Sequence, residues 1–336
     1  MIVKNFFNEL SVFLNDNIAP ISNALDNDSH LLAIAFEQLR NLGGLKLLIP
    51  VECGGLGGGR AEWIEYNILL AQYSGALLFL QAQHQFAIVE LKKLLPDQSV
   101  HDFLKKVADS HLGLGISFAA NKKLLHVTKS DGGFIVSGKL PWVTGFHFYS
   151  SILLSFDIDG FVYYTLLPFQ SSQENTSILI SPRIDIAALD STHTVSVMLN
   201  EYYVDKDAII SKKPYQDKVH SEHPAIYNFA GAANALLHIA MNGKYKNNKQ
   251  VKLNYAILLD EWNDYYSKIV NNNACPLTLR ASGFQLAQKC IHFARIACGA
   301  ESLVSSHTIN RITREVWQYT IAGYSEDQLE AYLSIL

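Results

Sequence analysis

The chain has few cysteines, no long apolar run and no recognisable cleavage site near its start. Its 336 residues include 4 cysteines and no Cys-x-x-Cys pair. This is too few for a disulfide scaffold and is typical of reduced thiols in the cytoplasm. No apolar run approaches the roughly 18–20 residues that a membrane-spanning helix needs. The N-terminal segment has no small-residue cleavage site, so we expect no signal peptide.

Charged residues are also scarce. They make up 17% of the chain and the net charge is −4, so the clustered positive charge that nucleic-acid binding needs is missing. Hydrophobic residues make up 49%, which is too many for a disordered chain. We therefore expect a soluble, cytoplasmic, well-packed protein with no nucleic-acid partner and no membrane span.

The spacing of the apolar residues changes twice along the chain. Residues 1–110 repeat apolar positions at helical spacing, and residues 210–336 do so again. Residues 111–209 alternate with period two in short runs such as 134–138 and 193–199, which turn signals separate. Short strands without helices between them predict an antiparallel barrel or sandwich. The sequence thus predicts an N-terminal helical domain, a middle β domain and a C-terminal helical domain with these bounds.

Two local segments are candidates for binding. Gly54–Gly57 reads GGLG, but it matches neither glycine-rich phosphate motif, so we interpret it as a tight turn between helices. The second segment, 138–145, reads GKLPWVTG. In a strand, Trp142 and Thr144 point to the same face and could hold a planar heterocycle. The alternative is a tryptophan in a sandwich core with an ordinary threonine beside it.

The order of the blocks and several segments resemble the acyl-CoA dehydrogenase superfamily along almost the whole chain. The middle segment, with "G.K.WiT.g", is the most specific. The segments that carry the resemblance are GLKLLIPVECGGLG at 44–57, DGGFIVSGKLPWVTG at 131–145, LDSTHTV at 189–195 and RITRE at 311–315.

The resemblance implies an α+β fold made of an N-terminal helical domain, a middle antiparallel β-barrel and a C-terminal helical bundle. It also implies FAD between the barrel and the C-terminal helices, with the flavin ring against Trp142 and Thr144 bonding its polar edge. Ser117 and Arg314 are further candidate flavin contacts. Substrate would lie on the other flavin face, with an acyl chain running between helices. A homodimer or homotetramer is implied as well.

The chain departs from the family at the catalytic glutamate. The family carries this glutamate at one of two positions. In this chain the first position is occupied by Ala322 or Gly323, and the second falls near Pro224. A general base is needed because the α-proton of an acyl thioester is only weakly acidic. Glu222 lies close to the second place and is the candidate base. Glu326 is displaced by about one helical turn and is expected on a solvated face.

Two loops also differ from the pattern of the family. The loop after Ser117 is shorter than the family's substrate loop, and the usual diphosphate-binding arm is replaced by a lysine-rich stretch at 242–250. Three interpretations stay open. The chain is an FAD oxidoreductase acting on an acyl thioester or similar small substrate without the usual glutamate, a flavin monooxygenase on the same fold, or a non-catalytic binding or assembly member.

The remaining histidines predict no metal site. His220 and His223 could form a metal pair, but a surface turn is favoured because no further ligands lie nearby. His84 is expected as a core or cleft-lining histidine. His307 and Arg311 share a helical stripe with Arg314, for which we expect structural ion pairing.

Overall fold

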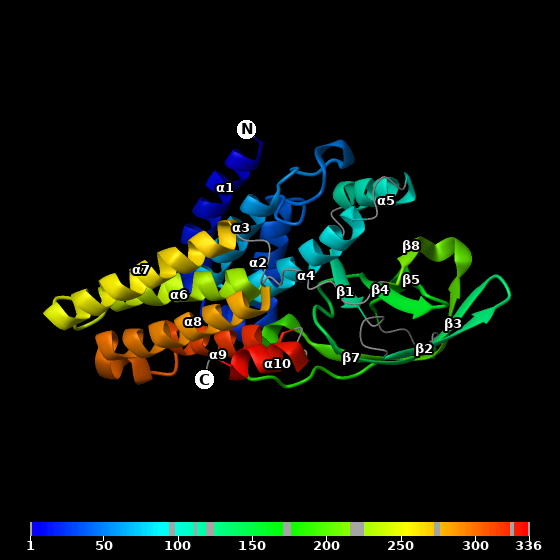
Figure 1. Cartoon of the computed structure of the whole chain (residues 1–336). Coiled ribbons are helices and arrows are strands. Elements are labelled where there is room, and N and C mark those ends of the chain that lie inside the picture. The colour runs from blue at the N-terminus through cyan, green and yellow to red at the C-terminus, as the bar shows by residue number, and fades with distance from the viewer. Residues whose placement is uncertain are drawn as a thin grey trace.

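The computed structural model describes residues 2–93, 98–110, 113–118, 124–170, 176–215, 225–271, 276–322 and 326–334. Helices lie at both ends of the chain and strands lie in the middle (Figure 1). The helices before the strands are α1 (Ile2–Phe13), α2 (Ser29–Asn41), α3 (Arg60–Tyr73), α4 (Gly75–Lys92) and α5 (Gln98–Asp109). The strands are β1 (Leu114–Phe118), β2 (Leu125–Ser130), β3 (Gly133–Val143), β4 (Ser151–Ile158), β5 (Phe161–Pro168), β6 (Ile178–Ile180), β7 (Val195–Asp205) and β8 (Ile209–Pro214). The later helices are α6 (Ala225–Asn242), α7 (Lys249–Asn271), α8 (Pro276–Cys298), α9 (Thr308–Ile321) and α10 (Glu326–Leu333).

Helix α2 shows how local sequence sets the boundaries. The Asp28 side chain accepts the backbone N–H groups of His30 and Leu31, each at 3.0 Å, and so caps the first turn. Gly43 follows the helix with a φ of +88°, a left-handed conformation that ends it. One face of α2, with Phe36 at its centre, is buried in the core.

The strands form two four-stranded sheets, in the orders β1-β4-β5-β8 and β2-β3-β7-β6. The sheets face each other, with the rings of Phe134 and Phe156 5.4 Å apart. Described strand pairs are antiparallel except β1 and β4, which are parallel. Strand periodicity cannot predict this exception, because side chains alternate in the same way in both kinds of pair.

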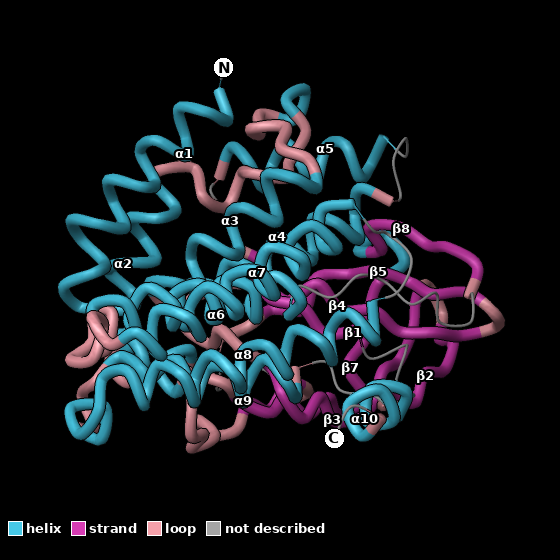
Figure 2. Tube along the Cα trace, turned by 60° about the vertical axis from the view of Figure 1, so that its left-hand side comes forward, coloured by secondary structure: helices cyan, strands magenta, loops and turns pink. Residues whose placement is uncertain are grey.

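Helix α6 is the centre of the helical part and packs against α3, α7, α8 and α9. Almost all of its side chains are buried. A Cβ on Gly231 would lie 2.5 Å from the Ala71 Cβ and 2.5 Å from the Ile68 carbonyl oxygen, so only glycine permits this approach of α6 to α3. Figure 2 shows α6, α8 and α9 side by side, with α10 next to the β region.

The predicted fold class is confirmed: along the chain, a β region lies between two helical regions. The structure changes to strands between Asp109 and Leu114 and returns to helices between Pro214 and Ala225. The division into domains at 110 and 209 stays a prediction. None of the described helices combines the length and the hydropathy needed to cross a membrane.

Candidate functional site

The end of β3 exposes an aromatic ring beside a hydroxyl group. Trp142 is 65% exposed, whereas Val143 is buried and Thr144 is partly exposed. This alternation places Trp142 and Thr144 on the outer face of the sheet, while Val143 enters the core. The structure thus excludes the alternative in which Trp142 is a core residue.

Neighbouring strands bring further polar groups to this position. The Thr144 hydroxyl lies 3.1 Å from the hydroxyl of Thr194, just before β7. A Cβ on Gly115 of β1 would lie 3.7 Å from the Thr144 carbonyl oxygen, and Ser117 is two residues further along β1. Gly115 of β1 thus approaches the end of β3, although β1 and β3 belong to different sheets. The place of Ser117 beside Trp142 and Thr144 stays a prediction.

The backbone around Thr144 and Thr194 adopts left-handed conformations. His147 has a φ of +74°, His193 of +49° and Leu189 of +58°. Such residues cost free energy, and they cluster where the surrounding structure holds a functional geometry. The rings of His147 and His193 are 5.4 Å apart. Burial lowers the pKa of His193, and the nearby His147 lowers it further.

A hollow of about 570 Å³ lies beside the segment that contains His147. Its lining includes Arg40, His147 and the rings of Phe146, Tyr149 and Phe169. Its volume falls in the range of small-molecule sites.

Arg314 lies elsewhere. Its guanidinium donates to Asp26 Oδ2 from Nη2 at 2.5 Å and from Nε at 3.2 Å. The other oxygen of Asp26 accepts the backbone N–H of Leu189 at 2.8 Å. Arg314 thus reaches the strained turn before β7 through a carboxylate. Its predicted contact with flavin stays a prediction.

The backbone N–H groups of the glycine-rich loop donate to carbonyl oxygens of the same loop. Gly55 donates its N–H to Pro50, Gly57 to Ile49 and Gly58 to Leu47, at 2.8–3.0 Å. A phosphate cradle needs such groups to point outward. The described loop is therefore a turn between α2 and α3, as predicted from the absence of a phosphate motif.

An arginine of α8, Arg280, bonds to the C-terminal end of α9. Arg280 is buried and donates to the carbonyl oxygens of Tyr319 at 2.8 Å and Ala322 at 2.6 Å. Gly323, the alternative position for the family's glutamate, lies outside the described residues, as do Glu222, His220, His223 and Pro224. Glu326 and Asp327 form the exposed first turn of α10.

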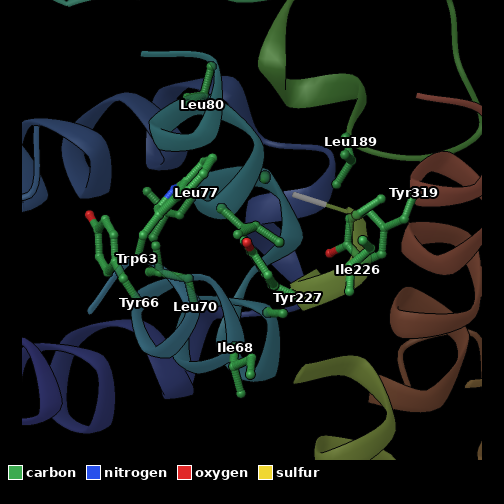
Figure 3. Packing of buried hydrophobic residues seen from close by; sticks show 14 of the residues in the cluster. Trp63, Tyr66, Ile68, Leu70, Leu77, Leu80, Leu189, Ile226, Tyr227 and Tyr319 are labelled. Atoms are coloured by element: carbon green, nitrogen blue, oxygen red, sulfur yellow. The ribbon is translucent and has the colours of Figure 1, made fainter. Parts of the chain in front are cut away.

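The space between α3, α4 and α6 is filled by side chains (Figure 3). The rings of Trp63 and Tyr227 are 5.6 Å apart, and Gln81 donates to Asn67 at 3.1 Å. All four side chains are buried. An acyl chain between these helices would have to displace them.

His84 is fully buried, and both of its ring nitrogens have partners. Nδ1 accepts the N–H of Leu114 at 3.1 Å, so the ring proton is on Nε2, which donates to the Leu45 carbonyl at 2.8 Å. Burial lowers its pKa to about 4, although the bond to Leu45 opposes this shift. His84 therefore joins α4, β1 and the segment after α2.

The lysines at 242–250 are exposed. Lys244, Lys246 and Lys249 all face solvent, and Lys244 Nζ lies 5.6 Å from the centre of the Tyr245 ring. Among the described residues there is no group of three or more His, Cys, Asp or Glu side chains able to hold a metal ion.

Sequence reasoning missed two parts of this arrangement. Thr194 and His193 lie in the 189–195 segment, for which the sequence indicated only a resemblance to the superfamily and no site residue. Nothing in the sequence indicated that Asp26 has distant partners, because a single aspartate near a helix start usually acts as a local cap. Its two partners, Leu189 and Arg314, are 163 and 288 residues away.

Neither a protein-family model nor a curated protein sequence matches the chain. Solved structures do match. Butyryl-CoA dehydrogenase from Megasphaera elsdenii is 13% identical, with 99% of this chain and 97% of that chain covered at a TM-score of 0.81. The nitrososynthase from Micromonospora carbonacea var. africana is 15% identical, with 99% and 96% covered at a TM-score of 0.78.

A third match is the FMN-bound dibenzothiophene monooxygenase TdsC from Paenibacillus sp. A11-2. It is 15% identical, with 99% of this chain and 95% of that chain covered at a TM-score of 0.73. These matches span both a dehydrogenase and a monooxygenase, in agreement with the resemblance of the sequence. The chain has the acyl-CoA dehydrogenase fold over almost its whole length.

Proposed function

We propose that this chain binds a flavin at Trp142, Thr144 and Ser117 and acts as a flavin-dependent oxidoreductase on a small molecule. The exposed indole of Trp142 beside the Thr144 hydroxyl is the observation that supports this most strongly. Stacking a planar ring on the indole would bury both apolar faces. A polar ring edge in such a site needs a partner, because an unpaired one costs about 1–3 kcal/mol.

The residues of the chain would position the ring. Trp142 would set its plane, and Thr144, held by Thr194, would bond its polar edge. The strained turn at His193 keeps Thr194 in place, because the N–H of Gly145, just after β3, donates to the Thr192 carbonyl at 2.9 Å. When bound, a flavin supplies the acceptor or donor for two electrons. We propose FAD from the sequence resemblance, with FMN as the alternative because one of the matched structures contains it.

A monooxygenase is the second candidate, and two observations favour it. The buried side chains of Trp63, Tyr227, Asn67 and Gln81 fill the space between α3, α4 and α6 in which a long acyl chain would run. The described end of α9 presents carbonyl groups to Arg280 and no carboxylate. A monooxygenase would need neither the channel nor the base.

Flavin binding can be tested by titrating the purified protein with FAD and with FMN while following the quenching of tryptophan fluorescence and the flavin spectrum. Trp142→Ala should weaken binding by about tenfold or more, since stacking of aromatic rings is worth about 0.5–1.5 kcal/mol beyond area burial. Tyr203→Ala is the matched control, because Tyr203 is an exposed aromatic residue in the same sheet. A wild-type protein that takes up no flavin would leave only the non-catalytic interpretation.

The reaction class needs a separate test. Anaerobic mixing with acyl-CoA thioesters should bleach the flavin of a dehydrogenase, and Glu222→Gln should abolish this bleaching while flavin stays bound. Retained bleaching in this variant would exclude Glu222 as the base. A monooxygenase should instead consume O₂ only when reduced flavin is supplied, and no thioester should bleach it.

We also propose that the chain forms a homo-oligomer. Several large apolar side chains of α9 and α10 are exposed in the single chain, namely Trp317, Ile321, Leu329 and Leu333. Apolar residues at i and i+4 lie on one helix face, and such faces are typical of association surfaces.

A further inference from the structure

Two turns cross beside the candidate flavin site, and each carries a histidine at the crossing. The first turn follows β3 and contains His147, and the second precedes β7 and contains His193. Two backbone hydrogen bonds join the turns. The Gly145 N–H donates to the Thr192 carbonyl at 2.9 Å, and the Phe146 N–H donates to the His193 carbonyl at 3.2 Å. The two turns are therefore held together directly beside the histidines.

The same crossing sets the position of two hydroxyl groups. Thr144 precedes Gly145, the donor of the first of these hydrogen bonds, and Thr194 follows His193, the acceptor of the second. The hydroxyl oxygens of Thr144 and Thr194 lie 3.1 Å apart, and Thr194 is buried. Because a pair at about 3.6 Å is no longer hydrogen-bonded, a small separation of the turns would release Thr144 from Thr194.

The two imidazole rings contact each other across this crossing. Their centres are 5.4 Å apart and their planes are inclined at 71°, an edge-to-face arrangement that suits neutral rings. His147 is exposed and His193 is partly buried, so a proton from solvent reaches His147 more easily. When both rings are protonated, two positive charges face each other at this distance and repel.

The charges around His193 disfavour its protonation. Burial is the largest cause that lowers its pKa, the nearby His147 and Arg183 lower it further, and Asp190 opposes the shift. Asp190 is already paired with Arg183, with 2.9 Å between Oδ2 and Nη1. Arg40 lines the same hollow as His147 and adds a further positive charge on that side. The crossed turns thus hold His193 in its neutral form.

We propose that His147 and His193 are positioning residues of the flavin site and that they weaken flavin binding as the pH falls. This inference rests on the proposed flavin site at Trp142 and Thr144. Once the turns separate, the His193 ring meets water and takes up a proton at its ordinary pKa of about 6.5. Protons therefore favour the separated turns, so flavin affinity is fully present above about pH 6.5 and declines below it.

The test is the affinity of the full chain for FAD at pH 7.5 and at pH 5.5, measured by the quenching of tryptophan fluorescence. FAD suits this range because its diphosphate does not titrate there, unlike a phosphomonoester with a second pKa of about 6. The wild type should bind FAD at least about threefold more weakly at pH 5.5. His193→Asn and His147→Asn should each lose less affinity over this range, because asparagine tolerates a left-handed backbone but cannot titrate.

A matched control and a second measurement make the result specific. His126→Asn, at an exposed histidine of β2, should keep the wild-type ratio of the two affinities. His84 is present in every variant, so its own titration affects all of them alike. Proton NMR titration examines the pair without flavin: the pKa of His193 should be higher in His147→Asn than in the wild type, because one cause that lowers it is removed.

The outcomes separate this proposal from the proposed function. A protein that binds no FAD at pH 7.5 would refute the flavin site and the pH dependence with it. If FAD binds, equal affinity at the two pH values would overturn only the role of the histidines, and so would a wild-type ratio in His193→Asn. An unchanged pKa of His193 in His147→Asn would show that the two rings do not act as a pair.

Discussion

Asp26 and Arg314 form an ion pair that joins the N-terminal helices to α9, although 288 residues separate them. The Asp26 side chain is fully buried, while that of Arg314 is 29% exposed. Because the second oxygen of Asp26 accepts the N–H of Leu189, the same pair also holds the turn before β7. This turn carries Thr194, the partner of Thr144, so helix packing and the candidate flavin site are linked.

The unequal burial of this pair predicts unequal effects of mutation. Arg314→Met should lower the free energy of unfolding by about 3–5 kcal/mol, because it leaves the buried Asp26 carboxylate unpaired. Asp26→Asn should cost only about 1–2 kcal/mol, since Arg314 can reach water and the amide oxygen can still accept from Leu189. Urea unfolding of both variants measures the difference. Equal losses would show that the exposure of Arg314 is irrelevant.

The Asp26→Asn variant also tests whether Asp26 positions the candidate flavin site. Asp26→Asn replaces the charged acceptor of the Leu189 N–H by a weaker neutral one, so it should reduce flavin affinity several-fold, although Asp26 touches neither Trp142 nor Thr144 in the structure. A merely destabilising substitution should not do this in a folded sample. Leu39→Ala, a core change in α2, serves as the comparison at equal stability. Unchanged flavin affinity in Asp26→Asn would exclude the coupling.

His84 predicts acid sensitivity. Its pKa is about 4 in the folded chain and about 6.5 in the unfolded chain, so the unfolded state binds a proton between these values and the folded state does not. The His84 contribution is therefore fully present above pH 6.5 and declines as the pH falls toward 4. The loss amounts to about 3 kcal/mol.

The measurement is the free energy of unfolding between pH 7.5 and 4. His84→Gln can still donate to Leu45 and accept from Leu114 but cannot titrate. The variant should be somewhat less stable at pH 7.5 and should lose less stability on acidification than the wild type. Parallel pH profiles for the two proteins would contradict the role of His84.

The turn between α2 and α3 predicts a position that accepts only glycine. A Cβ on Gly55 would lie 2.1 Å from the Ile49 carbonyl oxygen, so Gly55→Ala must displace the backbone and should cost roughly 1–3 kcal/mol. In the same loop, a Cβ on Gly59 would meet only the Glu62 carboxylate at 3.4 Å. Gly59→Ala should cost less than about 1 kcal/mol. Thermal unfolding of the two variants should rank them in this order, and the reverse order would contradict the described turn.

The proposed oligomer predicts that a charge on α9 shifts the assembly. Trp317 is 53% exposed and Ile321 is 60% exposed, one helical turn apart. Trp317→Asp should favour the single chain in light scattering coupled to size exclusion, because a buried unpaired charge opposes association. Val12→Asp, at an equally exposed position of α1, should leave the mass unchanged. A wild-type protein that is monomeric at all concentrations would refute the oligomer.

Much of the fold was predictable because secondary structure leaves a local period in the sequence. The described α-helices fall within residues 1–110 and 210–336, and the strands at 133–143 and 195–205 overlap the alternating runs at 134–138 and 193–199. The shared face of Trp142 and Thr144 was also predictable, because strand alternation is a local rule, but the sequence left open whether this face is buried or exposed. The parallel pairing of β1 with β4 was not, since the period is the same in either direction.

The sequence by itself determined the order of helical and β regions, the turn at the glycine-rich loop and the shared face of Trp142 and Thr144. These features depend on backbone preferences and on spacings of two to four residues. The tertiary structure alone decided the partners of Asp26 and His84, and with them the anchored turn before β7. Such pairings depend on which surfaces pack together, and packing brings side chains hundreds of residues apart into contact without leaving a periodic trace in the sequence.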